Sequence, residues 1–335
     1  MYALRIDSTD PAFNLALEET LFHSLSPDNP GIFLIWRNAP SVIIGCHQNT
    51  AEEVNSLYCR EHGITVVRRP TGGGAVYHDL GNVNFSFLVW VEKNRLAGFN
   101  EFMEPMVAAL RDLGVNALYT SRNDITVDGR KVAGTAQRRA GQKMLHHGCL
   151  MVDVDTSVLT GALAADPEKF RSKGVASHRA RVANLREFLP AGLTSAQCMD
   201  MVISAMTRRC AEEERSLDPK LKEQAEALAE SRYRSWEWNW GHSPRFTEKR
   251  RHRFSWGRLE CLLEVRSGII SGCRMFGDFF SLRDISELEK ILTGKRADAV
   301  SLRRSLSDIP VESWFSGAGR EELINFLCGD DTPQA

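Results

Sequence analysis

The sequence predicts a mixed α/β or α+β protein made of a large domain and a small one. Short apolar runs bounded by Gly, Pro and Ser alternate with helical patterns through most of the chain. A tryptophan-rich segment, "SWEWNWGHSPRF", then interrupts this alternation, and the residues after it resemble an antiparallel meander followed by helices. A length of 335 residues suits one large core with a smaller one beside it. We therefore expect two domains, at residues 1–243 and 244–335.

The large domain is predicted to open with a helix. Asp10 is a suitable N-cap, Pro11 fits the first helical position, and apolar residues recur every four positions from Phe13 to Leu25. Helices are also predicted over 51–62, 101–113 and 220–231, and one that starts at the capping box of Thr194 and Gln197. Strands are predicted at "GIFLIWR", "SVIIGC", "ITVVRR", "AVYHD", "VNFSFLVW" and "MLHHGCLMVDVD", with a tight hairpin at Asp128-Gly129.

Composition excludes several classes of protein. The net charge is −1, so no global field draws the chain to nucleic acid or to a membrane. No apolar run is long enough for a membrane span, and the N-terminus lacks the pattern of a signal peptide. The eight cysteines are scattered without a C-x-x-C pair, which predicts reduced thiols in a cytoplasmic protein and no structural zinc site.

The stretch "RRPTGGGAVYHD" is the first candidate site. Its three glycines, Gly72, Gly73 and Gly74, lie between two predicted strands, so neither the Walker A pattern nor the dinucleotide fingerprint fits. Glycines permit an anion-binding nest of backbone N–H groups, and Arg68 and Arg69 would add two permanent charges. The alternative is a wide hairpin connection with two solvent-facing arginines.

The hairpin "DGRKVAGTAQRR" is the second candidate. Strand alternation predicts that Lys131 faces the same side as Ala133, whose small side chain would leave room for a substrate, while Gly134 keeps the backbone accessible. Arg138 would add a second charge further along the strand. The alternative is a pair of solvated cations on a hairpin edge. The basic run at 249–253 is interpreted as a solvated linker or strand edge.

Histidines and a cysteine lie near both candidates. His146 and His147 must face opposite sides of a strand, so one is expected to be structural and the other to line a pocket; His78 is similar. Cys149 follows them and is either a nucleophile or, more often for a cysteine in an apolar strand, a small buried hydrophobic residue. No metal triad is indicated by the spacing.

Several of these stretches, taken together and in order, resemble the bacterial two-domain lipoate–protein ligases. They are "FNLALEE", "IWRNAPSVIIGCHQN", "VVRRPTGGGAVYHDLGNVNFSF", "RNDITVDGRKVAGTAQR", "HHGCLMVDVD", "KGVASHRARVANL" and "SWEWNWGHSPRF". The glycine loop followed by a D-G-R-K-V-x-G hairpin is a specific combination. The sequence departs from the family at Pro70-Thr71, where small hydroxyl residues are common, at Cys46, where arginine is frequent, at Gln137 and after Gly277.

The resemblance implies a fold shared with biotin protein ligases and related to class II aminoacyl-tRNA synthetases, with a small C-terminal α+β domain. It implies that lipoate reacts with ATP, in the presence of Mg²⁺, to give lipoyl-AMP and pyrophosphate. A lysine of a lipoyl domain then takes the lipoyl group. The acceptors would be E2 subunits of 2-oxoacid dehydrogenases and the glycine-cleavage H protein, with the enzyme a monomer that uses no nucleic acid or membrane.

The resemblance also assigns residues. Lys131 matches the essential lysine of the family. The positions that match ATP and lipoyl-AMP contacts are Arg68, Arg69, Gly72, Gly73, Gly74, Ala75, Val76, Tyr77, Asn123, Asp124 and Lys131. Those assigned to lipoate are Trp36, Arg68, Gly73, His78, Lys131, Ala133, Gly134, Arg138 and His147. Asp124 would hold Mg²⁺ or orient Lys131.

Three alternative functions remain open from the sequence. The first is a lipoyl or octanoyl transferase that uses preformed lipoyl-AMP. The second is a transferase that works through a Cys149 thioester. The third is a protein of the same fold that binds lipoate without catalysis.

Overall fold

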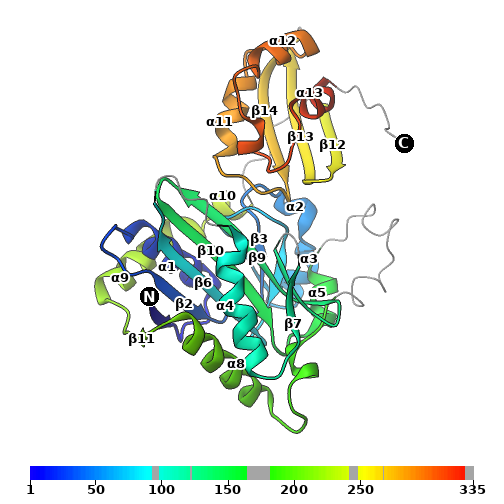
Figure 1. Ribbon diagram of the computed structural model, residues 1–335. Coiled ribbons are helices and arrows are strands. Elements are labelled where there is room, and N and C mark those ends of the chain that lie inside the picture. Colours follow the sequence, from blue (N-terminus) through cyan, green and yellow to red (C-terminus); the bar gives the residue numbers. More distant parts are fainter. Residues whose placement is uncertain (93–97, 121–122, 164–181, 241–247, 267, 329–335) are drawn as a thin grey trace. The chain divides into compact units, whose positions relative to one another are not determined.

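The structure is a computed structural model that describes residues 1–92, 98–120, 123–163, 182–240, 248–266 and 268–328. The chain forms two compact units. Unit 1 comprises Met1–Ile44, Thr50–Pro70 and Val76–Trp240; unit 2 comprises Gly45–Asn49, Thr71–Ala75 and Gly241–Ala335. The predicted boundary at residue 243 and most of the "KGVASHRARVANL" stretch lie outside the described residues. The expected mixed α/β class, with a separate C-terminal part, is confirmed (Figure 1).

Unit 1 is built on a mixed sheet of eight described strands in the order β11-β1-β2-β6-β10-β9-β8-β7. The pairs β11/β1 and β1/β2 are parallel, and the other neighbours are antiparallel. The strands are β1 Tyr2–Arg5, β2 Ile32–Trp36, β6 Asn82–Trp90, β7 Ala117–Thr120, β8 Asp124–Val127, β9 Arg130–Ala140, β10 Lys143–Met151 and β11 Glu213–Glu214.

A second, smaller sheet in unit 1 contains the two strands that precede and follow the glycine loop in the sequence. Its order is β4-β3-β5, with β3 Ser41–Ile44, β4 Thr65–Arg68 and β5 Val76–His78. β4 is parallel to β3 and β5 is antiparallel to it, so β4 and β5 lie on opposite sides of β3 and do not pair. Arg68 and Arg69 are only 8% and 6% exposed. The interpretation of the loop as a hairpin with solvent-facing arginines is therefore wrong.

The helices of unit 1 include all those predicted, although one of them is divided. They are α1 Pro11–Ser24, α2 Thr50–Glu53, α3 Ser56–Glu61, α4 Phe99–Asp112, α5 Thr156–Ala162, α8 Ser195–Cys210, α9 Pro219–Leu228 and α10 Trp236–Asn239. The two short helices α5 and α10 were not predicted. The single helix predicted over 51–62 is divided into α2 and α3. Val54 forms a bridge with Leu163, and the Asn55 side chain accepts the Tyr58 N–H at 3.2 Å, which starts a new helix.

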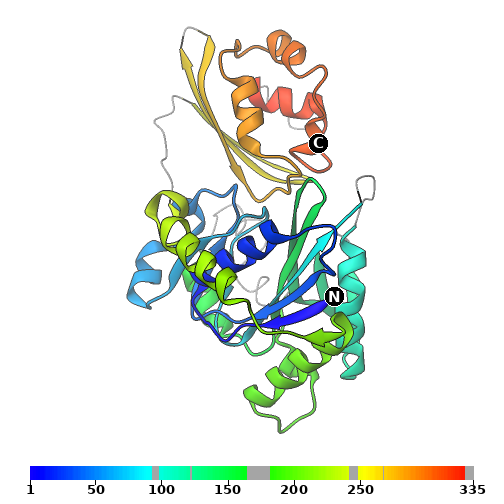
Figure 2. The same cartoon turned by 90° about the vertical axis from the view of Figure 1, so that its left-hand side faces the viewer.

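The main sheet has one largely apolar face and one mixed face. Phe33, Phe85 and Phe87 pack against α4 and α8 in the largest core cluster. Residues of the opposite face, such as Leu34, Leu88 and Leu145, pack against α1. Figures 1 and 2 show α4 and α8 on one side of this sheet and α1 and α9 on the other. We call the α1 side the inner face; polar side chains collect there.

His146 belongs to the apolar face and is structural. It is fully buried, stacks on Phe102 with ring centroids 5.0 Å apart, and is bonded to Gln137 at 2.9 Å. Burial, with a smaller effect of the His147 charge, lowers its pKa to about 3. The expectation that His146 and His147 separate to two faces, one of them structural, is confirmed.

This burial predicts acid sensitivity. A histidine titrates near 6.5 in the unfolded chain, so between that pH and about 3 the unfolded state binds more protons. The stabilising effect of neutral His146 is complete above pH 6.5 and declines below it, by about 2 kcal/mol at pH 5. His146→Phe is expected to reduce the loss of unfolding free energy between pH 7 and pH 5, as measured by urea denaturation. An unchanged loss would contradict the prediction, and His62→Phe at an exposed site is the control.

Unit 2 contains the predicted meander. β12 Glu248–Phe254, β13 Gly257–Arg266 and β14 Ile269–Gly277 form an antiparallel sheet. Three helices pack with it around an apolar core: α11 Ile285–Leu292, α12 Ala299–Ser305 and α13 Arg320–Cys328 (Figure 2). The basic run 249–253 lies in edge strand β12, where Lys249 pairs with Glu260 and Arg253 with Asp278. The interpretation as a strand edge is confirmed.

Two predictions about the whole chain are tested here. All eight cysteines are free thiols, as expected. Among the described helices, none has the length and apolarity needed to cross a bilayer.

Candidate active site

The inner face of the main sheet carries a row of five residues that lie directly opposite one another on adjacent strands. Trp36 lies opposite Asn84, Asn84 opposite Cys149, Cys149 opposite Gly134, and Gly134 opposite Asp124. Opposed residues on neighbouring strands share a face. We call this set the cross-sheet row. It joins positions 36, 84, 124, 134 and 149, which no local sequence pattern connects.

Lys131 joins this row because of a β-bulge. The register between β8 and β9 runs from Ile125–Ala133 to Thr126–Lys131, so Val132 is the extra residue. The bulge turns Lys131 to the inner face, and its ammonium lies over Gly134: a Cβ at Gly134 would be 2.9 Å from Lys131 Nζ. The prediction that Ala133 shares this side is wrong. Ala133 and Val132 both face the apolar core, so Ala133 does not line the site.

The Lys131 ammonium forms an ion pair with Asp124, with 2.7 Å between Nζ and Oδ1. Both side chains are about one third exposed, so a ligand can reach them. The Lys131 backbone is held by Ala183, whose N–H donates to the Lys131 carbonyl at 2.9 Å. Asn123 uses its side-chain N–H to bond the Thr135 carbonyl at 2.8 Å, and so it secures the hairpin beside Asp124.

Cys149 lies between Asn84 and Gly134 in the cross-sheet row. Burial raises the pKa of its thiol, although the nearby charges of Lys131 and Arg69 act to lower it. A reactive cysteine requires a stabilised thiolate. The setting therefore favours the interpretation of Cys149 as a small packed side chain, which is half-buried, and it also shows that the charges of both cations reach the same thiol.

His147 lies on the inner face one row further along β10, and a carboxylate that the sequence interpretation missed holds it. His147 Nδ1 is 2.8 Å from Glu18 Oε1 on α1, and the Ser86 hydroxyl bonds the same carboxylate. Glu18 and Ser86 are fully buried, and His147 is 7% exposed. Glu18 belongs to "FNLALEE", where its place in a helix gave no sign of a buried charge.

Arg138 is also paired with an acidic residue of α1. Its guanidinium donates to Glu19 at 3.1 Å, and Glu19 also accepts from Arg232 and from the Tyr233 hydroxyl. Burial opposes ionisation of Glu19, but these hydrogen bonds and charges outweigh it and lower its pKa. Arg138 thus reaches the inner face, where it neutralises Glu19.

Arg68 and Arg69 have separate positions. The Arg68 guanidinium donates to the Trp238 carbonyl at 2.8 Å and to the Thr50 hydroxyl at 2.7 Å, and its backbone N–H donates to Asn239. The tryptophan-rich segment is thereby fixed to β4. Arg69 bonds the Ile43 carbonyl at 3.1 Å and lies close enough to Cys149 and His78 to affect their titration. Arg69 is therefore the arginine whose charge reaches the cross-sheet row.

His78 is nearly buried on β5. Asn38 bonds its Nδ1 at 3.2 Å, and among the described residues its buried Nε2 has no partner. Burial, followed by the charges of Arg69 and His147, lowers its pKa to about 3. Tyr77 is buried and Val76 half-buried on the same strand, and burial raises the Tyr77 pKa to about 12. His78 is thus a neutral polar group near the inner face.

The glycine loop belongs to unit 2, together with Ala75. Gly73 has a φ of 93°, which a side chain would strain, and a Cβ at Gly72 would meet the Phe279 carbonyl at 2.6 Å. A Cβ at Gly74 would have its nearest neighbour at 4.0 Å, so the fold itself does not require glycine there. The expectation of positive φ is met at Gly73.

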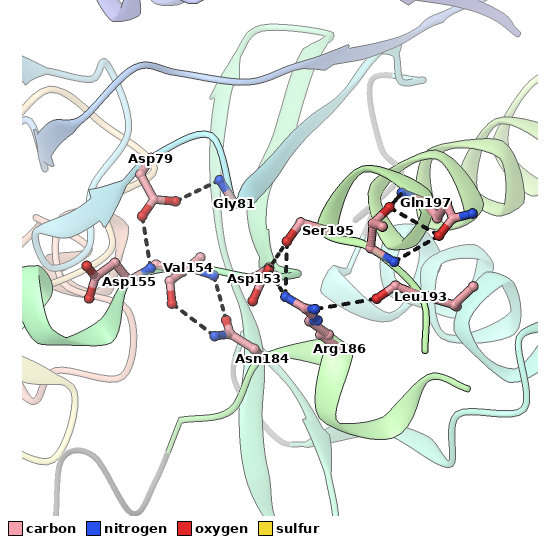
Figure 3. A network of polar contacts seen from close by, with 11 residues as sticks. Asp79, Gly81, Asp153, Val154, Asp155, Asn184, Arg186, Leu193, Ser195 and Gln197 are labelled. Atoms are coloured by element: carbon pink, nitrogen blue, oxygen red, sulfur yellow. Dashed lines mark hydrogen bonds and ion pairs between the residues drawn. The ribbon is translucent and has the colours of Figure 1, made fainter. Parts of the chain in front are cut away.

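A polar network between β5, the end of β10 and α8 was not predicted. Asp79 accepts from the Gly81 and Asp155 N–H groups at 2.7 and 2.9 Å, and Asn184 bonds both backbone groups of Val154 at 2.9 Å (Figure 3). Arg186 bonds Asp153 at 2.6 Å. This network ties residues 182–186, which contact the Lys131 backbone, to the strand that carries Cys149. Asp79 and Asn184 lie in the matched motifs, which is the signal that could have indicated them.

Metal binding has little support from side chains alone. Within the described ranges, no group of three or more His, Cys, Asp or Glu residues could hold an ion. Asp124 is a single carboxylate. That fits Mg²⁺ in nucleotide sites, where one or two carboxylates act together with phosphate oxygens and water.

Comparison with known proteins agrees with this arrangement. Residues 10–207 match the Lipoyl protein ligase A/B catalytic domain, and residues 243–327 match the Bacterial lipoate protein ligase C-terminus. Lipoate–protein ligase 1 of Staphylococcus aureus is 40% identical over 319 residues, which are 95% of this chain and 97% of that protein.

Two solved structures resemble the chain. One is a bi-partite lipoate protein ligase with its E2 lipoyl domain from Thermoplasma acidophilum, with a TM-score of 0.65 and 30% identity; the match covers 74% of this chain and 98% of that one. The other is a lipoate-protein ligase A bound with ATP, with a TM-score of 0.62 and 28% identity. That match covers 72% of this chain and 98% of the other one. Similarity along nearly the whole length, together with the match of both parts, shows that this chain belongs to the lipoate–protein ligase family.

Proposed function

We propose that this ligase joins lipoate to ATP and then passes the lipoyl group to a lysine of a lipoyl domain. In the first step a lipoate carboxylate oxygen attacks the α-phosphorus of ATP. The bond to pyrophosphate breaks and lipoyl-AMP forms. In the second step the acceptor amine attacks the acyl carbon, loses a proton and forms an amide, while AMP leaves. The observation that carries the proposal is the β-bulge that turns Lys131 over Gly134 beside Asp124.

Lys131 is the proposed catalytic residue because the two reactants of the first step are both anions. An ammonium that is about one third exposed and held at 2.7 Å from Asp124 has a defined position and can contact the carboxylate and the α-phosphate together. Its role is electrostatic, without a covalent bond to the acyl group. Arg69 would supply the second cation, because its charge, like that of Lys131, acts on the pKa of Cys149.

The nucleotide is proposed to contact the glycine loop Gly72–Gly74 with Ala75, and the strand that follows with Val76 and Tyr77. Support comes from the positive φ of Gly73 and from the clearance at Gly74. Asn123 and Asp124 are proposed as further contacts of the nucleotide. Mg²⁺ bound to ATP, with Asp124 as a ligand, would neutralise phosphate charge.

The lipoyl chain is proposed to lie on the inner face, against Trp36, Gly134 and His147, with His78 and Arg138 at its border. Ala133 is excluded by its place in the core, and Arg68 is given a structural role instead of a ligand contact. Wall residues that come from strands β2, β5, β9 and β10 would fix the chain relative to Lys131, and positioning of this kind supplies much of the rate in group transfer.

The acceptor and the cellular setting are also parts of the proposal. The E2 lipoyl domain that accompanies the Thermoplasma ligase supports a lipoyl-domain acceptor, and we extend this to E2 subunits and the glycine-cleavage H protein. Eight free thiols support a cytoplasmic location. We further propose that the protein is a monomer. We also propose a lipoate/ATP domain at 1–243 and an accessory domain at 244–335, and the two family matches support this division.

One assay tests the function against both transferase alternatives. The protein is mixed with ATP, Mg²⁺, lipoate and an unmodified lipoyl domain, and pyrophosphate release and acceptor mass are measured. We expect both pyrophosphate and a lipoyl adduct. A protein that uses only preformed lipoyl-AMP would give neither product from ATP and lipoate. Cys149→Ser is expected to keep activity within about threefold, since the thiol is half-buried and its pKa is raised, which disfavours the reactive thiolate. Complete loss in this variant would instead support the thioester route.

A further inference from the structure

Asn84 lies second in the cross-sheet row, between Trp36 and Cys149, and is unusual among the inner-face residues. Its side chain is 1% exposed, yet within the described residues neither its amide nitrogen nor its amide oxygen has a hydrogen-bond partner. A buried polar group without a partner is strongly disfavoured, and native proteins contain few of them. The amide therefore fits a partner that is not part of the folded chain.

The neighbours of Asn84 do not provide that partner. Trp36 and Cys149 lie directly opposite it on the two adjacent strands, and neither bonds the amide. The Trp36 indole N–H is buried and likewise has no partner in the described part of the chain. Two side chains with unused donors thus adjoin on the inner face, at the end of the row away from Lys131.

The position of the amide along the row limits what can bind it. Asn84 is on β6, and Lys131 is on β9, two strands away through β10. Adjacent strands lie about 4.8 Å apart, so the two strands are about 10 Å apart. The proposed site holds the carboxylate of lipoate at Lys131. At the distance of Asn84, the acyl chain has no oxygen, and its remaining polarisable group is the disulfide of the dithiolane ring.

We propose that the Asn84 amide donates a hydrogen bond to the dithiolane ring of bound lipoate and makes the site prefer lipoate over a straight-chain acid of the same length. This inference rests on the proposed function, because it takes the carboxylate position from Lys131. Sulfur is a weak acceptor, so the direct gain is modest. The larger contribution to the preference is the penalty for binding octanoate, because its methyl end would leave the buried amide without a hydrogen-bond partner.

The test compares lipoate and octanoate in wild type and in Asn84→Leu. Leucine has nearly the same size and no polar atoms. We expect the ratio of lipoate to octanoate, in both calorimetric affinity and kcat/KM for pyrophosphate release, to fall by about tenfold or more. Octanoate use is expected to stay level or rise. Asn84→Ala, which also removes the amide, should lower the ratio in the same direction.

Thermal unfolding separates this role from a structural one. Replacing an unpartnered buried amide by an apolar group of similar shape is close to neutral for stability or stabilising. Ligand-free Asn84→Leu should therefore unfold at or above the wild-type temperature. Thr20→Val is the matched control, since it removes a buried hydroxyl of α1 that bonds the Ala16 carbonyl, and it should leave the substrate ratio unchanged.

Two results would overturn the inference. An equal loss of affinity and kcat/KM with lipoate and octanoate would show that the amide contacts the carboxylate or serves only the stability of the fold. An unchanged ratio of lipoate to octanoate would show that the amide binds only water. The proposed function fails separately. Wild type that prefers lipoate in binding but releases no pyrophosphate would remove the ligase step and leave the Asn84 assignment in place. Wild type that releases pyrophosphate but shows no preference for lipoate over octanoate would support the ligase step and remove the Asn84 assignment.

Discussion

Lys131→Ala is expected to lower kcat for lipoyl-AMP formation by at least about a hundredfold to a thousandfold, which is the usual effect of removing one preorganised charge from a transition state. The ammonium is held over Gly134 and beside Asp124, so its loss leaves two anions without the cation that would screen them. The measurement is ATP- and lipoate-dependent pyrophosphate release at saturating substrates, with acceptor mass as a second readout.

Arg130→Ala is the matched control for this substitution. Arg130 is the preceding residue on the same hairpin and carries the same charge, but it pairs with Glu187 at 2.7 Å at a half-exposed site. Surface ion pairs contribute little, so we expect activity within a few-fold of wild type and a small change in stability. Equal losses in the two variants would show that the hairpin, and not the charge over Gly134, is what matters.

Arg68→Met and Arg69→Met are expected to have opposite signatures, although the residues are adjacent. The Arg68 guanidinium is buried and bonded to the Trp238 carbonyl and to Thr50. Its removal leaves buried acceptors without a donor, and we expect a loss of about 3 kcal/mol in unfolding free energy. That corresponds to a fall in Tm of about 6–12 °C for a unit of this size.

Arg69→Met is expected to act mainly on the reaction. Arg69 lies within electrostatic reach of Cys149 and His78, near the cross-sheet row. We expect kcat/KM for lipoate and ATP to fall by about a hundredfold, with a smaller decrease in Tm than in Arg68→Met. Differential scanning calorimetry and initial rates on both variants make the comparison. A kinetic defect confined to Arg68→Met would reverse the assignment.

Much of the fold followed from local patterns because the forces that set it are local. The capping box at Thr194 places the start of α8 as predicted, and Asp128-Gly129 turns the hairpin. Alternation in β6 separates Phe85 and Phe87 from Asn84 and Ser86. These features depend on residues a few positions apart, which a sequence displays directly.

The prediction from strand alternation was wrong in β9, where a bulge adds one residue to the strand. The bulge at Val132 places Lys131 and Ala133 on opposite faces of the sheet, and nothing in "GRKVAG" marks it. A bulge depends on how the strand fits its partner, and the partner is defined only once the sheet has formed. Glu18 and Glu19 were missed for a related reason. Side by side on one helix, they bond different groups, His147 and the Arg138–Arg232 pair, that come from distant parts of the chain.

The sequence by itself determined the family, the mixed α/β class, the motif residues and the chemistry that cations beside a glycine loop can support. Only the tertiary structure decided which of those residues face one another. It placed Lys131 on the inner face and separated a structural Arg68 from an Arg69 whose charge reaches the cross-sheet row. Among the described residues, it also left the buried Asn84 amide without a hydrogen-bond partner. The physical reason is that residue type and spacing set local conformation, whereas burial and pairing of charges depend on strands and helices that are far apart in the chain.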